Sequence, residues 1–296
     1  MTASDDLHQN SRKISVVIPT YNEEATIAEC ISSIQWGNVA PLEIIVADGL
    51  SSDRTQEIAR ERGAKVVANP QRTAAAGRNV GFRAARGEII AFTDGDCVVS
   101  PDWLGAFERA FADPEVAVVS GRVTPREPRN HYEEFWNNLN WKIIMAFDDE
   151  PYTVTERSLR QGVITASCAY RKNVLEELGG FDTWFGNNAE DVDLGWRALA
   201  AGFKTVYIPK AEIYASGALT MKELERKAFR DGYSSSKLQK RYGGLINFDK
   251  NIYRLLRKNL RARQWASIDA KMERHQLLWH LLGKYYGSLR TGIINV

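Results

Sequence analysis

The sequence predicts an α/β protein whose central sheet is mostly parallel and flanked by helices. Four short apolar runs rich in β-branched residues alternate with segments that carry apolar residues at helical spacing. Strand and helix repeated in this way are typical of a doubly wound parallel sheet. Polar and acidic residues directly follow three of the four runs, where sheets of this kind bind ligands.

The four predicted strands are nearly continuous in apolar residues, as expected of strands that are covered on both faces. They span residues 14–19, 42–48, 64–69 and 88–94. Helical spacing predicts the intervening helices at 23–35, 54–62 and 74–86. The carboxyl ends of the first, second and fourth strands should therefore meet at one crevice.

Beyond the fourth strand the pattern is less regular. A Trp-rich helical stretch is expected at 132–147, and a helix at 171–182 should end at its glycine pair. Residues 187–203 predict a second helix, with Asn188 as its cap and Gly202 at its end. The run "KTVYIP" predicts a closing strand at 204–209.

We expect three regions along the chain. Residues 1–12 form a disordered tail, and residues 13–215 form the folded α/β domain. Residues 216–296 form a basic amphipathic helical extension, which could act as a lid or contact a membrane or a second subunit.

Composition favours a globular chain in a reducing compartment. The three cysteines, Cys30, Cys97 and Cys168, are far apart and show no metal-ligand spacing, so we expect no disulfide framework. The first residues carry acids and lack the apolar core of a signal peptide. No apolar run reaches the roughly 18 residues of a membrane-spanning helix. We expect a cytoplasmic protein, with a peripheral place at the cytoplasmic face of a membrane as a further option.

Charge is distributed unevenly. Residues 250–296 contain ten Lys and Arg residues and only two acids, whereas the chain as a whole carries a formal charge of +2. A basic tail on an acidic body indicates an anionic partner, either a membrane surface or a nucleic acid.

The sequence "TDGD" places Asp94 and Asp96 at the end of the fourth strand, with Gly95 between them. Mg²⁺ and Mn²⁺ prefer carboxylate oxygens and take one or two protein ligands, leaving room for phosphate oxygens. Gly95 would let a ligand approach the backbone closely. The alternative is a tight turn or a helix cap, which uses the same residue types.

Two other strand ends carry polar side chains. Thr20 and Glu23 in "PTYNEE" should face the crevice. Asp48, after the second strand, could accept a hydrogen bond from a nucleobase or ribose, or could form an Asx-turn. Asp53 fits a helix N-cap, with Gln56 at the capping-box position.

Charged residues of two predicted helices are further candidates. The helix at 74–86 and its approach carry four arginines, and the sequence alone does not say which is directed at the crevice to bind a base or pyrophosphate. Glu190, Asp191 and Asp193 crowd the first turn of another helix. The helix dipole accounts for acids there, but one of them could equally be a general base.

Five ordered motifs carry a resemblance to a known family. They are "SVVIPTYNEE", "IIVADGLSSDRT", "GRNVGFRAARGEIIAFTDGD", "YRKNVLEELGGFD" and "AEDVDLGWRA". In order and spacing, residues 14–209 resemble the family-2 inverting glycosyltransferases with the GT-A fold, a Rossmann-like sheet flanked by helices.

The resemblance implies a role for each matching residue. The nucleotide pocket would be formed by Pro19, Thr20, Glu23, Asp48, Arg78, Asp94 and Gly95. Asp96 and Asp94 match the family's metal motif, and Asp191 matches the catalytic base. The acceptor or sugar pocket would be shaped by Phe181, Asp182, Trp184 and Glu190. Trp184 could stack on a sugar face or lie in the core.

The resemblance also implies the reaction and its participants. A sugar would move from a UDP- or GDP-sugar to a hydroxyl acceptor with inversion, aided by Mn²⁺ or Mg²⁺. The acceptor could be a growing glycan or a polyprenyl- or other lipid-linked carrier, an oligomer is possible, and we expect no nucleic-acid partner. Alternatives are a nucleotidyltransferase acting on a sugar phosphate, for which "PTYNEEAT" lacks a glycine-rich phosphate loop, and a non-catalytic sugar- or nucleic-acid-binding module.

Overall fold

The computed structural model describes residues 14–139, 148–157, 162–217, 220–243 and 268–293. The chain divides into two compact units. The first comprises Met1–Thr124, Phe147–Arg157 and Gln161–Ala215. The second comprises Pro125–Ala146, Ser158–Arg160 and Ser216–Val296, and so takes two segments from within the expected 13–215 domain. The predicted tail at 1–12 lies outside the described residues.

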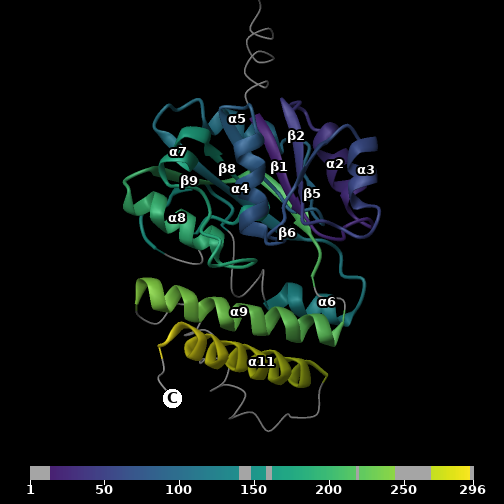
Figure 1. Cartoon of the computed structure of the whole chain (residues 1–296), viewed down its shortest axis with the longest axis vertical. Coiled ribbons are helices and arrows are strands. Elements are labelled where there is room, and N and C mark those ends of the chain that lie inside the picture. Colours follow the sequence, from purple (N-terminus) through teal and green to yellow (C-terminus); the bar gives the residue numbers. More distant parts are fainter. Residues whose placement is uncertain (1–13, 140–147, 158–161, 218–219, 244–267, 294–296) are drawn as a thin grey trace, which may run out of the picture. The chain divides into compact units, whose positions relative to one another are not determined.

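Half of the sheet in the first unit is parallel, as predicted (Figure 1). Its strands lie in the order β3-β2-β1-β4. They are β1 (Ile14–Thr20), β2 (Glu43–Asp48), β3 (Lys65–Ala68) and β4 (Ile89–Phe92). Strands β2 and β4 pair with β1 on opposite sides, so the strand order reverses at β1. Sheets of this kind bind ligands beside such a reversal.

The other half of the sheet is antiparallel where pairing is described. The order continues from β4 as β8-β6-β9-β5, and β7 pairs with β9. These strands are β5 (Val98–Val99), β6 (Val116–Pro125), β7 (Tyr152–Thr153), β8 (Cys168–Arg171) and β9 (Lys204–Ala215). The closing strand β9 is thus longer than the predicted 204–209, because it continues past Pro209 to pair with β5.

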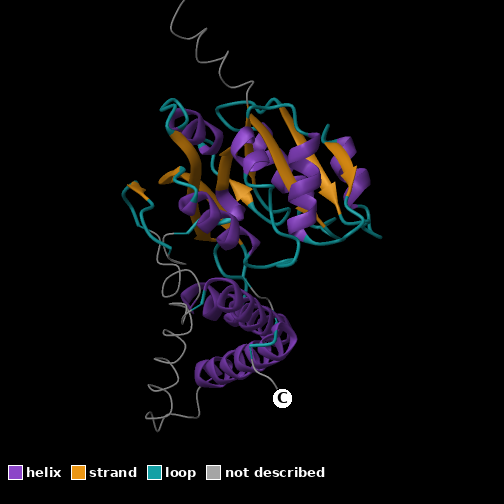
Figure 2. Ribbon diagram, turned by 60° about the vertical axis from the view of Figure 1, so that its left-hand side comes forward, coloured by secondary structure: helices purple, strands orange, loops and turns teal. Residues whose placement is uncertain are grey.

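Helices cover both faces of this sheet (Figure 2). They are α2 (Ile27–Gln35), α3 (Thr55–Glu61), α4 (Ala74–Ala84), α5 (Trp103–Ala110), α7 (Lys172–Glu177) and α8 (Glu190–Ala200). Helix α2 begins four residues later than predicted, because residues 23–26 belong to the turn after β1. The side chain of Thr73 caps α4 by accepting a hydrogen bond from the amide of Ala76.

The core confirms burial on both faces for β1 but not for every parallel strand. Ile14, Val17 and Ile18 of β1 are fully buried. Strand β3 lies at the end of the sheet, and Lys65 and Ala68 at its ends are exposed. The prediction that β3 is covered on both faces was therefore wrong. A short apolar run in the sequence looks the same whether its strand lies at the edge or in the middle of a sheet.

The expected helix ends are confirmed at two places and wrong at a third. Gly179 and Gly180 follow α7 with φ of +73° and +76°, a left-handed conformation that glycine adopts without strain. Gly202 follows α8 with φ of +83°. The N-cap of α8 is Ala189, with φ of +70° and no side-chain cap, rather than Asn188.

The second unit is helical in the part that is described. It contains α6 (His131–Trp136), α9 (Met221–Tyr242) and α11 (Ile268–Thr291). Leu224 of α9 and Met272 of α11 are fully buried in a cluster with the aromatic side chains of α6. Within the described residues, no helix has the length and apolar character needed to cross a bilayer. Residues 140–147 of the predicted Trp-rich helix, and the basic stretch at 250–263, lie outside the described residues.

Candidate active site

The ends of β1 and β2 are joined by Thr20 and Asp48. These residues are register partners, and the Thr20 hydroxyl donates to Asp48 Oδ1 at 3.1 Å. Asp48 also accepts from the hydroxyl and amide of Ser51 and from Gln56 Nε2, the last at 2.8 Å. Its side chain is buried and has four donors, one of them the amide of Ser51 three residues on, and its contact with a base or ribose stays a prediction. A nucleotide could hydrogen-bond to Asp48 only by displacing one of these donors.

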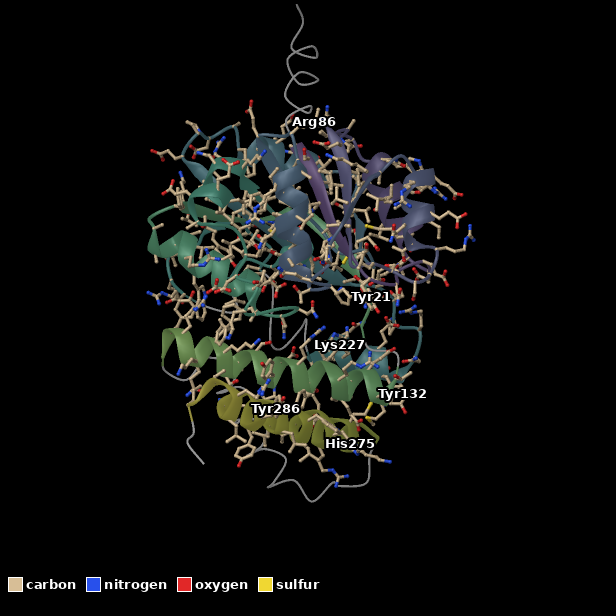
Figure 3. The ribbon with its side chains drawn as sticks, viewed as in Figure 1. Tyr21, Arg86, Tyr132, Lys227, His275 and Tyr286 are labelled. Atoms are coloured by element: carbon tan, nitrogen blue, oxygen red, sulfur yellow. The ribbon has the colours of Figure 1, made fainter. Side chains whose placement is uncertain are left out.

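Backbone amides of the β1 turn are held by side chains from the β2 turn. The amide of Asn22 donates to Ser51 Oγ at 2.9 Å, and that of Glu23 donates to Thr55 Oγ1 at 2.7 Å. The N-cap of α3 is Arg54, so the prediction for Asp53 was wrong by one residue. Asp53 accepts from the amide of Thr55 at 3.0 Å, but Gln56 turns to Asp48 and makes no capping box. These contacts fix the position of Glu23. Tyr21 of this turn lies at the opposite edge of the unit from Arg86, which precedes β4 (Figure 3).

The "DGD" turn lies against the β1 turn. A Cβ atom at Gly95 would be 3.1 Å from Thr20 Cγ2 and 3.4 Å from Glu23 Cγ, so the two turns are closely packed here. Asp94 is partly buried, whereas Asp96 is exposed. Pro19 is partly buried at the end of β1, and its ring lies against α4, where a Cβ at Gly77 would be 3.1 Å from it.

Negative charge accumulates between these two turns. Burial, and then the charges of Asp96 and Asp94, raise the pKa of Glu23 to about 7. A cluster of carboxylates that raises the pKa of Glu23 in this way fits a divalent cation, which prefers oxygen ligands and needs few of them from the protein. Among the described residues no group of three or more His, Cys, Asp or Glu could hold a metal ion. One or two carboxylates suffice for a cation whose remaining positions are filled by phosphate oxygens.

Arg78 is the arginine of α4 that points into the site. Its guanidinium is buried and donates to Asp94 Oδ1 at 2.7 Å and to Glu190 Oε1. Arg72, Arg83 and Arg86 are all exposed. The expected contact of Arg78 with a base or diphosphate stays a prediction, since the two carboxylates engage only its Nη1 and Nη2 atoms. Arg78 ties the "DGD" turn to the first turn of α8.

The three acids at the start of α8 have separate surroundings. Glu190 is buried against Arg78, and Asp193 is buried and accepts from Arg197 Nε at 2.8 Å. Asp191 is partly exposed, and its Oδ2 lies 3.3 Å from the amide of Thr165. Burial raises the pKa of Asp191, and the nearby Arg78 opposes that rise. Of the three, Asp191 alone is both partly exposed and at the site.

Glu190 was expected to face the acceptor. Its carboxylate is 3% exposed and contacts Arg78, so it supports the site from inside. Burial raises the pKa of Glu190, while the Arg78 charge lowers it. Because a buried carboxylate needs such a partner, the acceptor role predicted for Glu190 does not fit its position.

The segment between α7 and α8 holds the other predicted acceptor residues. Phe181 is buried and contacts the Phe92 ring edge-on, at 5.2 Å between centroids, so it supports the site from the core and does not line its surface. Asp182 is partly buried and accepts from the Trp184 amide at 2.8 Å in a local turn. The Trp184 side chain is 41% exposed, which leaves it accessible to a ligand.

Sequence reasoning missed three residues that shape the site. Asn79 of α4 exchanges two hydrogen bonds with the backbone of Phe181, at 2.7 and 2.8 Å. Gln56 holds Asp48, and Thr165 contacts Asp191. The only available signal was for Asn79, since an amide between the apolar positions of a helix requires a partner.

Comparisons with known proteins identify the family of the chain. Residues 15–179 match the model of Glycosyl transferase family 2, a match that ends before Asp191. A pre-mycofactocin glycosyltransferase from Mycobacterium tuberculosis is 28% identical over 229 residues, covering 75% of this chain but only 46% of the relative. An O-antigen chain rhamnosyltransferase from Salmonella typhimurium is 26% identical over 293 residues, covering 94% of this chain and 91% of the relative.

A solved structure has the same fold. The mannosyltransferase PcManGT from Pyrobaculum calidifontis, in complex with GDP-Man and Mn²⁺, superposes with a TM-score of 0.58 at 21% identity. The similarity covers 95% of this chain and 77% of that one.

Proposed function

We propose, since the chain belongs to glycosyl transferase family 2, that it transfers a sugar from a nucleoside diphosphate-sugar to a hydroxyl acceptor with inversion at the anomeric carbon. The first unit would carry the reaction. Its relatives include a mannosyltransferase and a rhamnosyltransferase, and we propose a hexose or deoxyhexose as the transferred sugar.

This proposal rests on the two carboxylate contacts that Arg78 makes. One guanidinium reaches Asp94, at the end of β4, and Glu190, at the start of α8. The turn suited to a diphosphate and the helix that bears Asp191 therefore lie within one side chain's span of each other. A donor on the first and an acceptor beside the second would be adjacent, as direct transfer requires.

Asp191 is the base in this scheme. Deprotonation of the acceptor hydroxyl by its carboxylate prepares the oxygen to attack the anomeric carbon from the face opposite the diphosphate. Its Oδ1 accepts from the amide of Val192 at 2.8 Å, and the α8 N-terminus favours negative charge there. Burial raises its pKa, which strengthens it as a base. Thr165 fixes the position of the second oxygen.

Asp96 and Asp94 would hold the divalent cation, with Glu23 beside them. When bound, such a cation offsets the charge that develops on the diphosphate leaving group. Thr20 and Asp48 form the wall of the nucleotide pocket through the turn that they hold together. Trp184 offers an exposed aromatic face to the sugar or the acceptor.

A donor panel tests this function. Purified protein is incubated with UDP- and GDP-sugars, Mn²⁺ and a glycan acceptor, and nucleoside diphosphate release is measured with the anomeric configuration of the product. We expect release that depends on the cation and stops with a chelator, and a product of inverted configuration. Retention of configuration, or no release with any donor although a donor binds, would contradict the proposal.

A further inference from the structure

Helix α11 buries glycine and polar residues and exposes several apolar ones. Among its buried residues are Met272, Gln276, His280, Gly283, Gly287 and Ser288, and the rings of Trp279 and Tyr286 contact Phe229 of α9. Three large apolar side chains lie on another side of the helix and are exposed. They are Leu278, Leu282 and Tyr285, which we call the outer stripe. A helix in water normally has the opposite arrangement.

The small residues let α9 and α11 approach until their backbones touch. A Cβ atom at Gly283 would lie 2.0 Å from the carbonyl oxygen of Phe229, and one at Gly232 would lie 1.9 Å from that of His280. Close approach through small residues on successive helical turns is the way helices associate where the surroundings are apolar. The helices run parallel, with His275 beside Glu225 near their starts and Gly287 beside Ser236 farther along (Figure 3).

The outer stripe is apolar and continues into basic residues at one end. Its exposed fractions range from 42% at Leu282 to 55% at Tyr285. Exposed Lys271 and Arg274 precede Leu278 by seven and four residues, so they continue the same side of the helix. Among the described side chains of α11 the only acid is Glu273, three residues before the buried Gln276 and thus on another side.

We propose that the outer stripe of α11 lies on an anionic lipid bilayer, with its leucines and Tyr285 in the interface and with Lys271 and Arg274 at the headgroups. Interfacial helices combine an apolar face with Lys and Arg near the surface, and tyrosine suits the boundary between lipid and water. Anionic lipid is the occupant that accounts for both the apolar side chains and the two basic residues beside them. This binding needs no substrate and is independent of the proposed sugar transfer.

Flotation of the full chain with vesicles tests the proposal. One set of vesicles is phosphatidylcholine alone, and a second contains phosphatidylglycerol as well. We expect the protein to float with the second set and much less with the first. The double variant Leu278→Gln/Leu282→Gln should lower the partition coefficient by about tenfold or more, because two leucines lose their place in the interface. Trp36→Gln removes an 81% exposed aromatic side chain from the first unit and should float as wild type does.

Three results would overturn the proposal. The first is wild-type protein that stays with the bottom fraction in both vesicle sets. The second is a double variant that floats as wild type does while keeping the same melting temperature. The third is wild type that is dimeric by light scattering without lipid, with a monomeric double variant, since a second copy would then be the occupant. Donor hydrolysis measured without vesicles separates each result from a failure of the proposed transfer.

Discussion

The guanidinium of Arg78 bonds the carboxylate of Glu190 inside the first unit, and both side chains are almost completely buried. The same guanidinium reaches Asp94. One cation thus neutralises two acids that come from different elements of the fold. Loss of one member of such a network leaves the others charged and without a partner.

Replacement of Arg78 should therefore destabilise the folded protein much more than replacement of an exposed arginine does. We expect Arg78→Met to lower the free energy of unfolding by about 3–5 kcal/mol, since two carboxylates lose their counter-charge. Urea unfolding of the variant and wild type measures this. Arg83→Met, on the exposed side of the same helix, should change stability by no more than about 0.5 kcal/mol. Equal effects of the two substitutions would contradict the account of Arg78.

The pKa of Glu23 predicts a pH dependence of stability. Burial and the charges of Asp96 and Asp94 raise it to about 7, above the ordinary value of 4.5. The folded protein then holds this proton more tightly than the unfolded chain does, so the contribution is fully present below pH 4.5 and is lost as pH rises toward 7.

The glutamine side chain of Glu23→Gln cannot ionise, so this variant should lack the loss of stability that Glu23 causes in wild type as pH rises. Its melting temperature relative to wild type should rise between pH 4.5 and 7 and stay level above that range. Glu61→Gln, on the exposed end of α3, controls for the loss of a surface carboxylate. A constant difference between Glu23→Gln and wild type across this range would show that the pKa of Glu23 is not raised in the folded protein.

Asp96 should be needed for the cation-dependent binding of a nucleoside diphosphate. A ligand at a hundred times its Kd stabilises the folded state by about 2.7 kcal/mol. We expect wild type to show such a thermal shift with Mn²⁺ and UDP or GDP, and Asp96→Asn to lose it. Asp102→Asn, outside the site at the start of α5, should keep the shift. An unchanged shift in Asp96→Asn would remove Asp96 from the cation site.

The sequence predicted the convergence of the strand ends because that convergence follows from topology. Parallel strands that alternate with helices bring their carboxyl ends to one edge, so residues after β1, β2 and β4 had to meet. Thr20 and Asp48 are in contact for this reason. The antiparallel half of the sheet was less accessible to sequence reasoning, because short strands such as β5 and β7 have no periodicity of their own.

Side-chain partners could not be predicted in the same way. Gln56 fits a capping box by spacing, but it turns to Asp48 because that buried carboxylate needs donors. Asn187 accepts from the amide of Ala74 in α4, and α8 begins after a left-handed Ala189 without a side-chain cap. The partner of Gln56 and the start of α8 both depend on contacts between segments that are far apart in the sequence. The spacing of neighbouring residues gives no information about such contacts.

Asp191 provides the most direct test of the whole account. Its carboxylate is proposed to take the proton of the acceptor, and removal of a general base typically costs 10²–10⁴-fold in rate. The measurement is nucleoside diphosphate release in the presence of acceptor by Asp191→Asn, with donor binding followed by thermal shift. We predict that release falls by about that factor while the donor shift remains. Release at the wild-type rate would show that Asp191 is not the base.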